Sequence, residues 1–333
     1  MSNALTWIGH FQGSASFPII NRNLTDALER RGLTVLRNRH NFNGGLTRLV
    51  IANQFPPQAI NVRHAVNVCA SIWEFTGPHA VPESFKKVFA GFDAVLVGNQ
   101  FVYDQYCQAT ATPVHVIRYL GVDPVEFSPQ GSRVNWGALF PGEDWPDNAR
   151  QIILMVGGTD LRHGWDVALA VLRRLPDDVH LVAKWDVHYP EIHFGDTHER
   201  LHILHKDLGT LAPLYRSADM FLMTARGVGF SFPVIEALAC GLPVASTPLP
   251  PIRDYAPVGR VVFGEGGQYV PLGIHHAHDD CLPWWWEPDA DGMYEATAQA
   301  LALPKQAPDA DWLARWSWDG VAEDFERGIE GWL

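Results

Sequence analysis

Short apolar runs alternate along the chain with segments whose apolar residues recur at helical spacing. The first run, Leu5–Ile8, precedes a glycine-containing loop at 9–14 and a helical pattern over 21–31 that ends at Gly32. The following runs are continuous, as in strands buried on both faces of a parallel sheet. They span 49–52, 65–72, 94–97 and 114–117, with a helical segment at 83–90. This alternation predicts a doubly wound α/β domain.

The alternation lapses over 130–148, a stretch with Gly, Pro and Trp that we interpret as a linker. It then restarts, with helices expected over 165–175 and 232–240 and with strands at 152–156, 180–183, 202–204, 220–223 and 244–245. Two consecutive Rossmann-like units are therefore expected. Such units place an active site in the cleft between them, at the carboxyl ends of the strands.

Composition agrees with two medium-sized globular domains. The 333 residues are 47% hydrophobic and 19% charged, which excludes a disordered chain. The net charge of −12 is uneven: residues 1–130 carry 10 Lys/Arg and 8 Asp/Glu, whereas 131–333 carry 15 and 29. The acidic total argues against a general binder of nucleic acid or anionic membranes.

Two further features limit the class of protein. The sequence has neither an apolar stretch of membrane-spanning length nor a signal-peptide layout, so a cytoplasmic protein is expected. The four cysteines show no C-x-x-C spacing, so neither a disulfide framework nor a zinc knuckle is expected. Nothing in the sequence indicates an oligomeric state.

The most informative segment is 226–246, where a loop of small residues leads into a helix. Ser231 is placed to cap this helix, and Pro233 suits its first turn. Free backbone N–H groups and the positive helix end would face an anion. Glu236, one turn into the helix, can accept two hydrogen bonds from a diol. A diphosphate joined to a ribose fits both features, although any parallel-sheet protein has loop-to-helix junctions.

This segment resembles the nucleotide-sugar site of the retaining group 1 glycosyltransferases of GT-B architecture. Their motif runs Ser-Arg-x-Glu-Gly-Phe-Gly-Leu-Pro-x-x-Glu-Ala-x-Ala-x-Gly-x-Pro-Val. The matching positions are Arg226, Gly229, Phe230, Pro233, Glu236, Ala237, Gly241, Pro243 and Val244.

Further stretches match the family in the same order along most of the chain. Residues 156–164 resemble its Val-Gly-Gly-Thr-x-x-Arg-Lys-Gly loop, and 181–184 resemble its Leu-Val-x-Lys strand. The other matches are Ile72-Trp73-Glu74, residues 92–101, the end of the first domain at 117–129, and Trp316-Ser317-Trp318-Asp319, which opens a last helix.

The resemblance implies roles for individual residues. It implies catalytic contacts by Glu74 with the acceptor hydroxyl and by Arg162 and Lys184 with the leaving diphosphate. Plainer interpretations are a carboxylate at the edge of the core and solvated surface cations. The residues implied to hold the donor are Gly13, Gly158, Thr159, Arg226, Gly229, Phe230, Ser231 and Glu236, with no metal and no required cofactor.

Two positions depart from the family pattern. Val228 stands where the family has the first of two carboxylates separated by seven residues, the one that contacts the donor sugar. Valine accepts no hydrogen bond, so the sugar is held differently, for example by Asp160, or transfer is impaired. His163 stands where the family has lysine.

Several clusters have a plain and a functional interpretation. We interpret the histidines at 188, 193, 198, 202 and 205, and those at 275, 276 and 278, as surface residues rather than metal ligands. Trp286-Glu287-Pro288-Asp289 is interpreted as the start of the penultimate helix, with sugar stacking by the three tryptophans at 284–286 as the alternative. The arginines at 30, 31, 37, 39 and 48 either form a solvated helix end and loop or favour a phosphate-bearing acceptor.

Together these observations predict a GT-B protein of two Rossmann-like domains facing across a cleft. The expected ranges are 1–130 for the acceptor, 131–315 for the nucleotide sugar, and 316–333 for a helix that crosses back to the first domain. The predicted activity is retaining transfer of a sugar from a UDP, GDP or ADP donor to an unidentified acceptor, either a glycan or a phosphate-bearing molecule. The alternatives are a GT-B phosphorylase or epimerase, and a catalytically degenerate subunit that binds nucleotide or a partner transferase.

Overall fold

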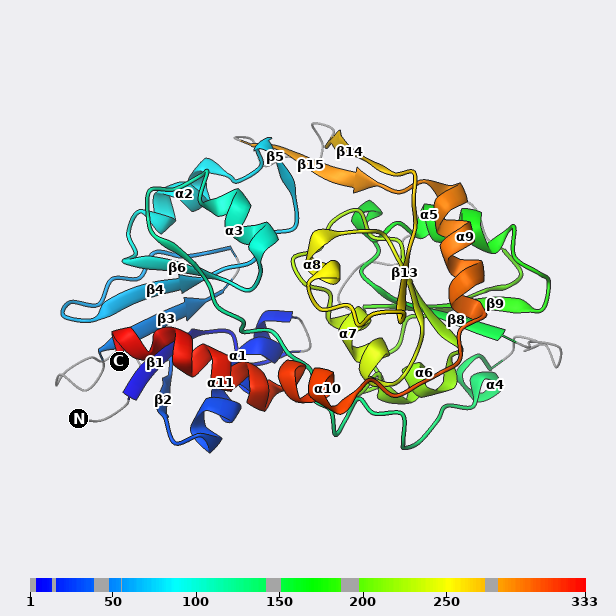
Figure 1. Ribbon diagram of the computed structural model, residues 1–333, viewed down its shortest axis with the longest axis horizontal. Coiled ribbons are helices and arrows are strands. Elements are labelled where there is room, and N and C mark those ends of the chain that lie inside the picture. The colour runs from blue at the N-terminus through cyan, green and yellow to red at the C-terminus, as the bar shows by residue number, and fades with distance from the viewer. Residues whose placement is uncertain are drawn as a thin grey trace. The chain divides into compact units, whose positions relative to one another are not determined.

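The chain folds into two compact units (Figure 1). The computed structural model describes residues 4–13, 16–38, 48–54, 56–141, 151–186, 198–272 and 281–333. Unit 1 comprises Met1–Gly121, Pro271–Trp284 and Ala314–Leu333, and unit 2 comprises Val122–Val270 and Trp285–Leu313. The first segment of unit 1 therefore ends at Gly121 rather than at the expected 130, and unit 1 also includes 271–284, which we expected in the second domain.

Unit 1 contains a parallel six-stranded sheet in the order β2-β1-β3-β4-β6-β7. Its strands are β1 (Ala4–Gly9), β2 (Thr34–Arg37), β3 (Leu49–Asn53), β4 (Val66–Ala70), β6 (Ala94–Val97) and β7 (Val114–Val116). Strands β1, β3, β4 and β6 confirm the buried apolar runs, whereas β7, at the edge of the sheet, is a strand but is partly exposed. β2 lacks such a run because only Val35 of its four residues is buried.

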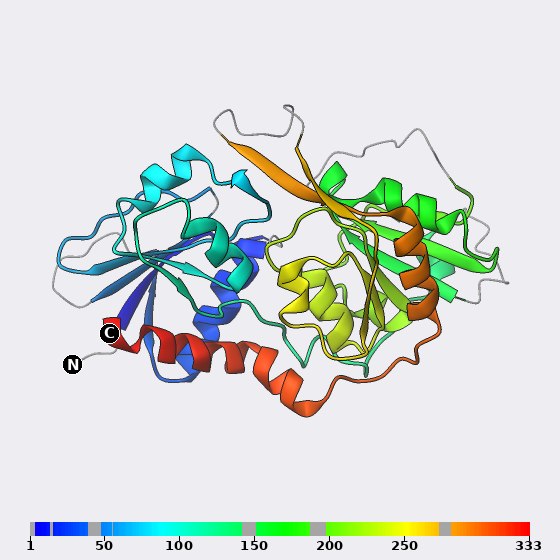
Figure 2. The same ribbon diagram turned by 45° about the horizontal axis from the view of Figure 1, so that its top comes forward.

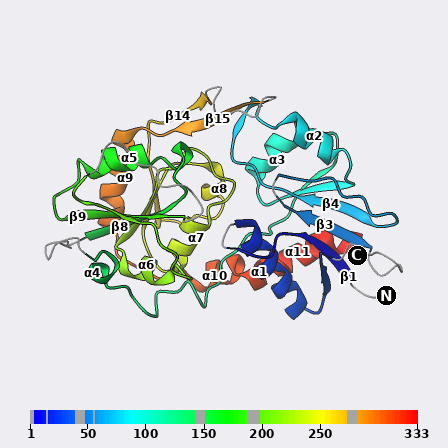
Figure 3. The same ribbon diagram turned by 180° about the vertical axis from the view of Figure 1, so that it is seen from behind.

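Helices cover both faces of this sheet. Helices α1 (Ser16–Arg30) and α11 (Trp318–Ile329) pack against each other, as Figure 3 shows, and the rings of Trp7 and Phe325 lie 5.6 Å apart beneath them. The expected return of the last helix to the first domain is thus confirmed. Helices α2 (Glu83–Phe89) and α3 (Gln100–Tyr106) supply Phe85, Phe89 and Tyr106 to a separate core cluster.

The inserted segment of unit 1 adds a short antiparallel pair. The residues of β15 (Leu282–Glu287) that belong to unit 1 pair with β5 (Thr76–His79). The expectation that Trp286 and Glu287 start a helix is wrong, because both lie in β15. Helix α9 (Ala290–Leu301) begins after them, where the Asp289 carboxylate accepts a hydrogen bond from the Gly292 N–H.

Unit 2 contains a second parallel six-stranded sheet, in the order β10-β9-β8-β11-β12-β13. Its strands are β8 (Gln151–Gly157), β9 (Val179–Trp185), β10 (Leu201–Leu204), β11 (Met220–Met223), β12 (Val244–Ser246) and β13 (Val261–Phe263). The first five confirm the predicted strands. β13 was not predicted, because its three residues are each only partly buried.

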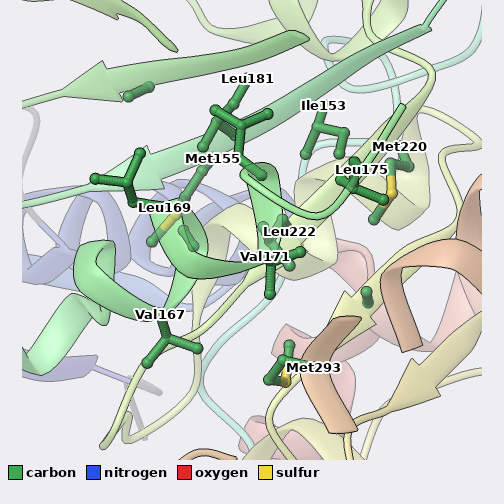
Figure 4. Close-up of a cluster of buried hydrophobic side chains, with 14 of the residues drawn as sticks. Ile153, Met155, Val167, Leu169, Val171, Leu175, Leu181, Met220, Leu222 and Met293 are labelled. Atoms are coloured by element: carbon green, nitrogen blue, oxygen red, sulfur yellow. The ribbon is translucent and has the colours of Figure 1, made fainter. Parts of the chain in front are cut away.

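Alternate residues of the central strands face two different layers. Helices α5 (Trp165–Leu172) and α9 lie side by side (Figure 2). Ile153 and Met155 join a core with these two helices (Figure 4). Phe221 points to the opposite face, where its ring contacts Tyr215 of α6 (Ala212–Ser217). Helix α7 (Phe232–Ala239) contacts β11 and β12. Other elements are α4 (Trp136–Leu139), α8 (Pro250–Arg253), β14 (Gln268–Pro271), α10 (Ala310–Trp316), η1 (Leu161–His163) and η2 (Glu330–Trp332).

The strand order places the functional loops. In unit 2 the connections from β8 and β11 leave in opposite directions, so a topological switch point lies between these strands. Ligands of open α/β sheets bind at the carboxyl ends of strands at such points. We name residues 157–164, after β8, the glycine loop and residues 224–231, after β11, the helix loop. No helix in the described parts of the chain has both the length and the apolar character of a membrane span.

Candidate functional site

The glycine loop and the helix loop are hydrogen-bonded to each other. Gly164 has φ +71°, and a Cβ at this position would lie 2.1 Å from the Thr224 carbonyl oxygen. The Thr224 hydroxyl donates to the Gly164 carbonyl at 2.8 Å, and the Arg226 N–H donates to the Arg162 carbonyl at 2.7 Å. The close approach requires a glycine at 164 and fixes the two loops as one platform.

The glycine loop carries three residues predicted from the sequence. Thr159 is buried, and the Gly158 carbonyl accepts a hydrogen bond from the Trp165 indole at 2.6 Å. Arg162 extends to the helix loop, where its guanidinium donates to the Gly227 carbonyl at 3.3 Å. The Asp160 carboxylate accepts from the Arg162 N–H at 3.0 Å. The loop thus holds one guanidinium against the neighbouring loop.

Lys184 lies at the end of the adjacent strand. In the β8–β9 register, Gly157 pairs with Trp185, so Lys184 is one residue from the start of the glycine loop. It is only 6% exposed, and its ammonium donates to the Trp185 carbonyl. Burial lowers the pKa of Lys184, against the charges of Asp186 and Asp207, which raise it. The carboxyl ends of β8 and β9 therefore carry two cations, Arg162 and Lys184.

Helix α7 begins at a strained residue. Ser231 occupies the N-cap position with φ +77°, a left-handed conformation that is uncommon for any residue except glycine. The expected capping bond is absent among the described residues, because capping hydroxyls reach the first turn from extended backbone. The buried Ser231 hydroxyl has no hydrogen-bond partner in the described part of the chain. A strained residue with an unpaired hydroxyl at a helix start is typical of a ligand site.

Glu236 lies one turn into α7 and is 8% exposed. Its carboxylate accepts a hydrogen bond from the Tyr215 hydroxyl at 2.9 Å. Burial raises the pKa of Glu236 to about 8; the Tyr215 hydrogen bond opposes this shift and the charge of Glu126 adds to it. Near neutral pH this carboxyl group can therefore act as either a hydrogen-bond donor or an acceptor.

Arg226 is engaged inside unit 2. Its guanidinium bonds Asp166 at 2.8 and 2.9 Å and Glu287 at 2.6 and 2.9 Å, and it also donates to the Leu161 carbonyl at 2.7 Å. The face of Trp285 lies 5.2 Å away. Burial alone would lower the pKa of Arg226, but the two carboxylates raise it above its usual value. This guanidinium joins the two loops to α5 and β15, and its charge is compensated there.

The apolar part of the helix loop is well packed. Phe230 contacts the rings of Phe232 and Tyr255, and the Tyr255 hydroxyl donates to the Phe230 carbonyl at 3.0 Å and to the Ser231 carbonyl at 3.1 Å. Gly229 precedes this cluster, and Val228 is 6% exposed. The loop thus presents a buried alkyl group at the position where the family has a carboxylate.

Unit 1 holds the two other predicted residues. Glu74 follows β4 in a half-buried position. Gly13 has φ +105°, and its carbonyl accepts from the Arg22 guanidinium at 2.9 Å, as does the Phe11 carbonyl at 2.8 Å. Asn21 donates to the His10 carbonyl at 2.8 Å. Helix α1 therefore holds the loop after β1, whose predicted end, Ser14, lies outside the described residues.

The arginines near the N-terminus of the sequence form ion pairs. Arg30 pairs with Asp319 at 2.6 Å and Arg31 with Glu326 at 2.8 Å, which links α1 to α11. Arg37 pairs with both Asp26 and Glu29 at 2.6 Å. Carboxylates thus neutralise these three arginines, and a phosphate-bearing acceptor stays a prediction. Arg39 lies outside the described residues.

In the described parts of the chain, no three His, Cys, Asp or Glu side chains gather closely enough to hold a metal ion. His202 is buried against His180, with their ring nitrogens 3.0 Å apart, so its interpretation as a surface residue is wrong. The histidines at 188, 193, 275, 276 and 278 lie outside the described residues.

Sequence reasoning missed the aromatic residues that support the site. Tyr215 lies on α6, 21 positions before the Glu236 that it contacts. Tyr255 follows α8, and its carbonyl accepts from the Trp312 indole at 2.7 Å. No spacing rule joins such distant positions. A buried tyrosine hydroxyl requires a hydrogen-bond partner, but the sequence does not show which tyrosines are buried.

Comparisons with known proteins agree with this geometry. Residues 150–268 match the family model described as Glycosyl transferases group 1. Sucrose-phosphate synthase from Thermosynechococcus elongatus is similar in structure, with 15% identity, a TM-score of 0.59 and coverage of 99% of this chain and 96% of that chain. Anabaena Alr3699/HepE in complex with UDP and glucose has 12% identity, a TM-score of 0.61 and coverage of 99% and 100%.

A third similar structure is the α,α-trehalose-phosphate synthase (UDP-forming) from Burkholderia xenovorans in complex with glucose-6-phosphate. It has 12% identity, a TM-score of 0.60 and coverage of 98% of this chain and 99% of that chain. No curated protein sequence matches the chain. The predictions of a GT-B fold and of a group 1 domain are confirmed. The chain has the GT-B fold, and its residues 150–268 match the group 1 glycosyltransferase family model.

Proposed function

We propose that the protein transfers a sugar, with retention of anomeric configuration, from a UDP-sugar bound by unit 2 to an acceptor hydroxyl bound by unit 1. The observation that carries this proposal is the gathering of Arg162, Lys184 and the start of α7 at the carboxyl edge of the sheet in unit 2. A diphosphate meets two cations and a positive helix end there. UDP is favoured over GDP and ADP because Anabaena HepE is described in complex with UDP and glucose.

The proposed chemistry needs no nucleophile from the protein. The acceptor oxygen bonds to the anomeric carbon as the bond from that carbon to the diphosphate oxygen breaks, and the hydroxyl proton passes to the leaving diphosphate. Arg162 and Lys184 stabilise the charge that develops on this group. Glu236 would bind the ribose and Glu74 would contact the acceptor hydroxyl. The remaining proposed donor contacts are Gly158, Thr159, Gly229, Phe230 and Ser231 from unit 2, and Gly13 from unit 1.

Isothermal titration with UDP, GDP and ADP tests the donor site. We expect binding of UDP, and Glu236→Ala should weaken it by about tenfold, since one hydrogen-bond partner of the ribose is lost. Glu295→Ala, at an exposed position on α9, is the matched control and should bind as the parent does. Absence of binding to all three nucleotides would overturn the proposal. An unchanged dissociation constant in Glu236→Ala would remove that residue from the site.

A second candidate is a nucleotide-binding subunit without transfer activity. Val228 favours it, because a buried alkyl group accepts no bond from a sugar hydroxyl. A mass-spectrometric screen of mixed nucleotide sugars separates the candidates, since transfer or hydrolysis releases the free nucleotide. Val228→Glu sharpens the result: a rise in turnover supports impairment by valine, whereas a fall supports valine as an adapted donor contact.

A further inference from the structure

His163 lies against the two glycines that open the glycine loop. A Cβ placed on Gly157 would come within 2.4 Å of His163 Nδ1, and one placed on Gly158 would come within 3.1 Å of Nε2. The absence of side chains at 157 and 158 therefore leaves the space that the imidazole fills. The ring is largely buried, with 13% of its side chain exposed.

The hydrogen bonds of His163 fix the position of its proton. The Gly158 N–H donates to Nε2 at 3.1 Å, and the Arg162 guanidinium lies 3.2 Å from the same nitrogen. Amide and guanidinium nitrogens only donate, so Nε2 must be unprotonated and the neutral ring carries its proton on Nδ1. One nitrogen thus holds both a loop amide and the Arg162 side chain.

The surrounding charges keep the ring neutral. Burial lowers the pKa of His163 to about 4, and the charge of Arg162 adds to this effect. Asp160, whose carboxylate is 3.7 Å from Nε2, and Asp186 act in the opposite direction. Near neutral pH the ring is therefore an acceptor. A lysine at this position would place a second cation beside Arg162.

We infer that His163 is a positioning residue for the donor site, where its Nε2 orients the Arg162 guanidinium and the Gly158 amide. This inference rests on the proposed function only in that Arg162 is taken to meet the donor diphosphate. In this inference His163 acts as a neutral hydrogen-bond acceptor and not as a cation that binds phosphate. The guanidinium donates to both His163 and the Gly227 carbonyl, and thus spans the two loops.

Three substitutions test the inference through UDP affinity, with thermal unfolding recorded for each. His163→Gln supplies an amide oxygen as the acceptor, so its affinity for UDP should stay within about threefold of that of the parent protein. His163→Leu and His163→Lys remove the acceptor and should each weaken UDP binding by about tenfold, the effect of one lost hydrogen bond. Tighter binding in His163→Lys, or unchanged binding in His163→Leu, would overturn the inference.

The proton position provides a readout that does not depend on nucleotide binding. Nitrogen-15 NMR of histidine-labelled protein at pH 7, assigned by the signals lost in His163→Gln, should show a neutral ring protonated on Nδ1. An imidazolium, or a ring protonated on Nε2, contradicts the inference even if UDP binds. The parent protein could show the Nδ1–H form and yet bind no nucleotide. This result would overturn both the proposed function and the donor-site role of His163, but the hydrogen bonds of His163 within the loop would remain established.

Discussion

The loops after β1 in unit 1 and after β8 in unit 2 are held by different sets of side chains. In unit 1, Asn21 donates to His10, Asn38 exchanges two hydrogen bonds with Gly9, and the Arg22 guanidinium donates to the Phe11 and Gly13 carbonyls. In unit 2 the corresponding loop is held by Arg226 and His163. Both units therefore use a guanidinium, but amides supply the other bonds in unit 1, whereas an imidazole does so in unit 2.

The buried cations do not lie in the part of the chain that is rich in basic residues. The acidic part of the chain supplies the buried cations, whereas arginines of the mildly basic part pair with carboxylates on α1 and α11. Net charge summed over a domain hides this distribution, because one buried guanidinium beside a loop matters more than several solvated ones. The following predictions test the contrast, from the largest expected effect to the smallest.

The buried carboxyl group of unit 2 should make stability depend on pH. The pKa of Glu236 is raised to about 8 from an ordinary value of 4.5, so the folded protein binds the extra proton between these values. The free energy of unfolding should therefore fall as the pH rises from 5 to 8, by up to about 3 kcal/mol. Urea denaturation at several pH values should give a flatter profile for Glu236→Gln. A profile unchanged from the parent, or equally flattened in Glu295→Gln, contradicts this.

Arg226→Gln tests the ion network of unit 2. The substitution leaves the Asp166 and Glu287 carboxylates close together without a cation, and should cost about 2 to 3 kcal/mol of unfolding free energy, somewhat less than for a fully buried pair. Arg174→Gln removes one arginine from the exposed pair with Asp291 and should cost less than about 1 kcal/mol. Equal losses in the two variants would mean that the network adds nothing beyond a surface pair.

Asn21→Leu tests the amide network of unit 1. Its side chain bonds the Trp7 indole at 2.8 Å, the Asn53 amide at 2.8 Å and the His10 carbonyl at 2.8 Å. Loss of these buried bonds should cost about 2 kcal/mol. Because no group in this set ionises near neutrality, the loss should be constant from pH 5 to 8. Asn23→Leu, at a half-buried position of the same helix, is the control. If the stability loss in Asn21→Leu varied with pH, unit 1 would not differ from unit 2 in its pH dependence.

Arg30→Gln should have the smallest effect. The pair with Asp319 is exposed on both sides, so its removal should change the unfolding free energy by less than about 0.5 kcal/mol. UDP affinity should not change. A large loss of stability would show that the pair is a main link between α1 and α11.

Periodicity predicted most of the fold, because strands buried on both faces leave continuous apolar runs. Periodicity did not predict the short strands β2 and β13, because β2 buries only one residue and β13 buries none fully. Trp286 and Glu287 were assigned to a helix start although both lie in β15, because so short a segment with a bulky apolar residue fits either structure.

The motif residues of the site were predicted, but their partners were not. Gly158, Arg162, Lys184 and Glu236 could be identified by matching motifs. The engagement of Arg226 with Asp166 and Glu287 could not, since these residues are distant in sequence and charged residues at such positions are usually solvated. The left-handed backbone of Ser231 could not be predicted either, because a serine before a helix is expected to be an ordinary N-cap.

Unit 1 is formed by three separate segments of the chain, and this affects how it folds during synthesis on the ribosome. Trp7 is made before unit 2, yet Phe325, whose ring packs on it, belongs to α11 and is made after the whole of unit 2. Domains usually fold as they leave the ribosome, amino-terminal first. Here the unit that is begun first must be completed last, and its apolar face stays uncovered during translation of everything between.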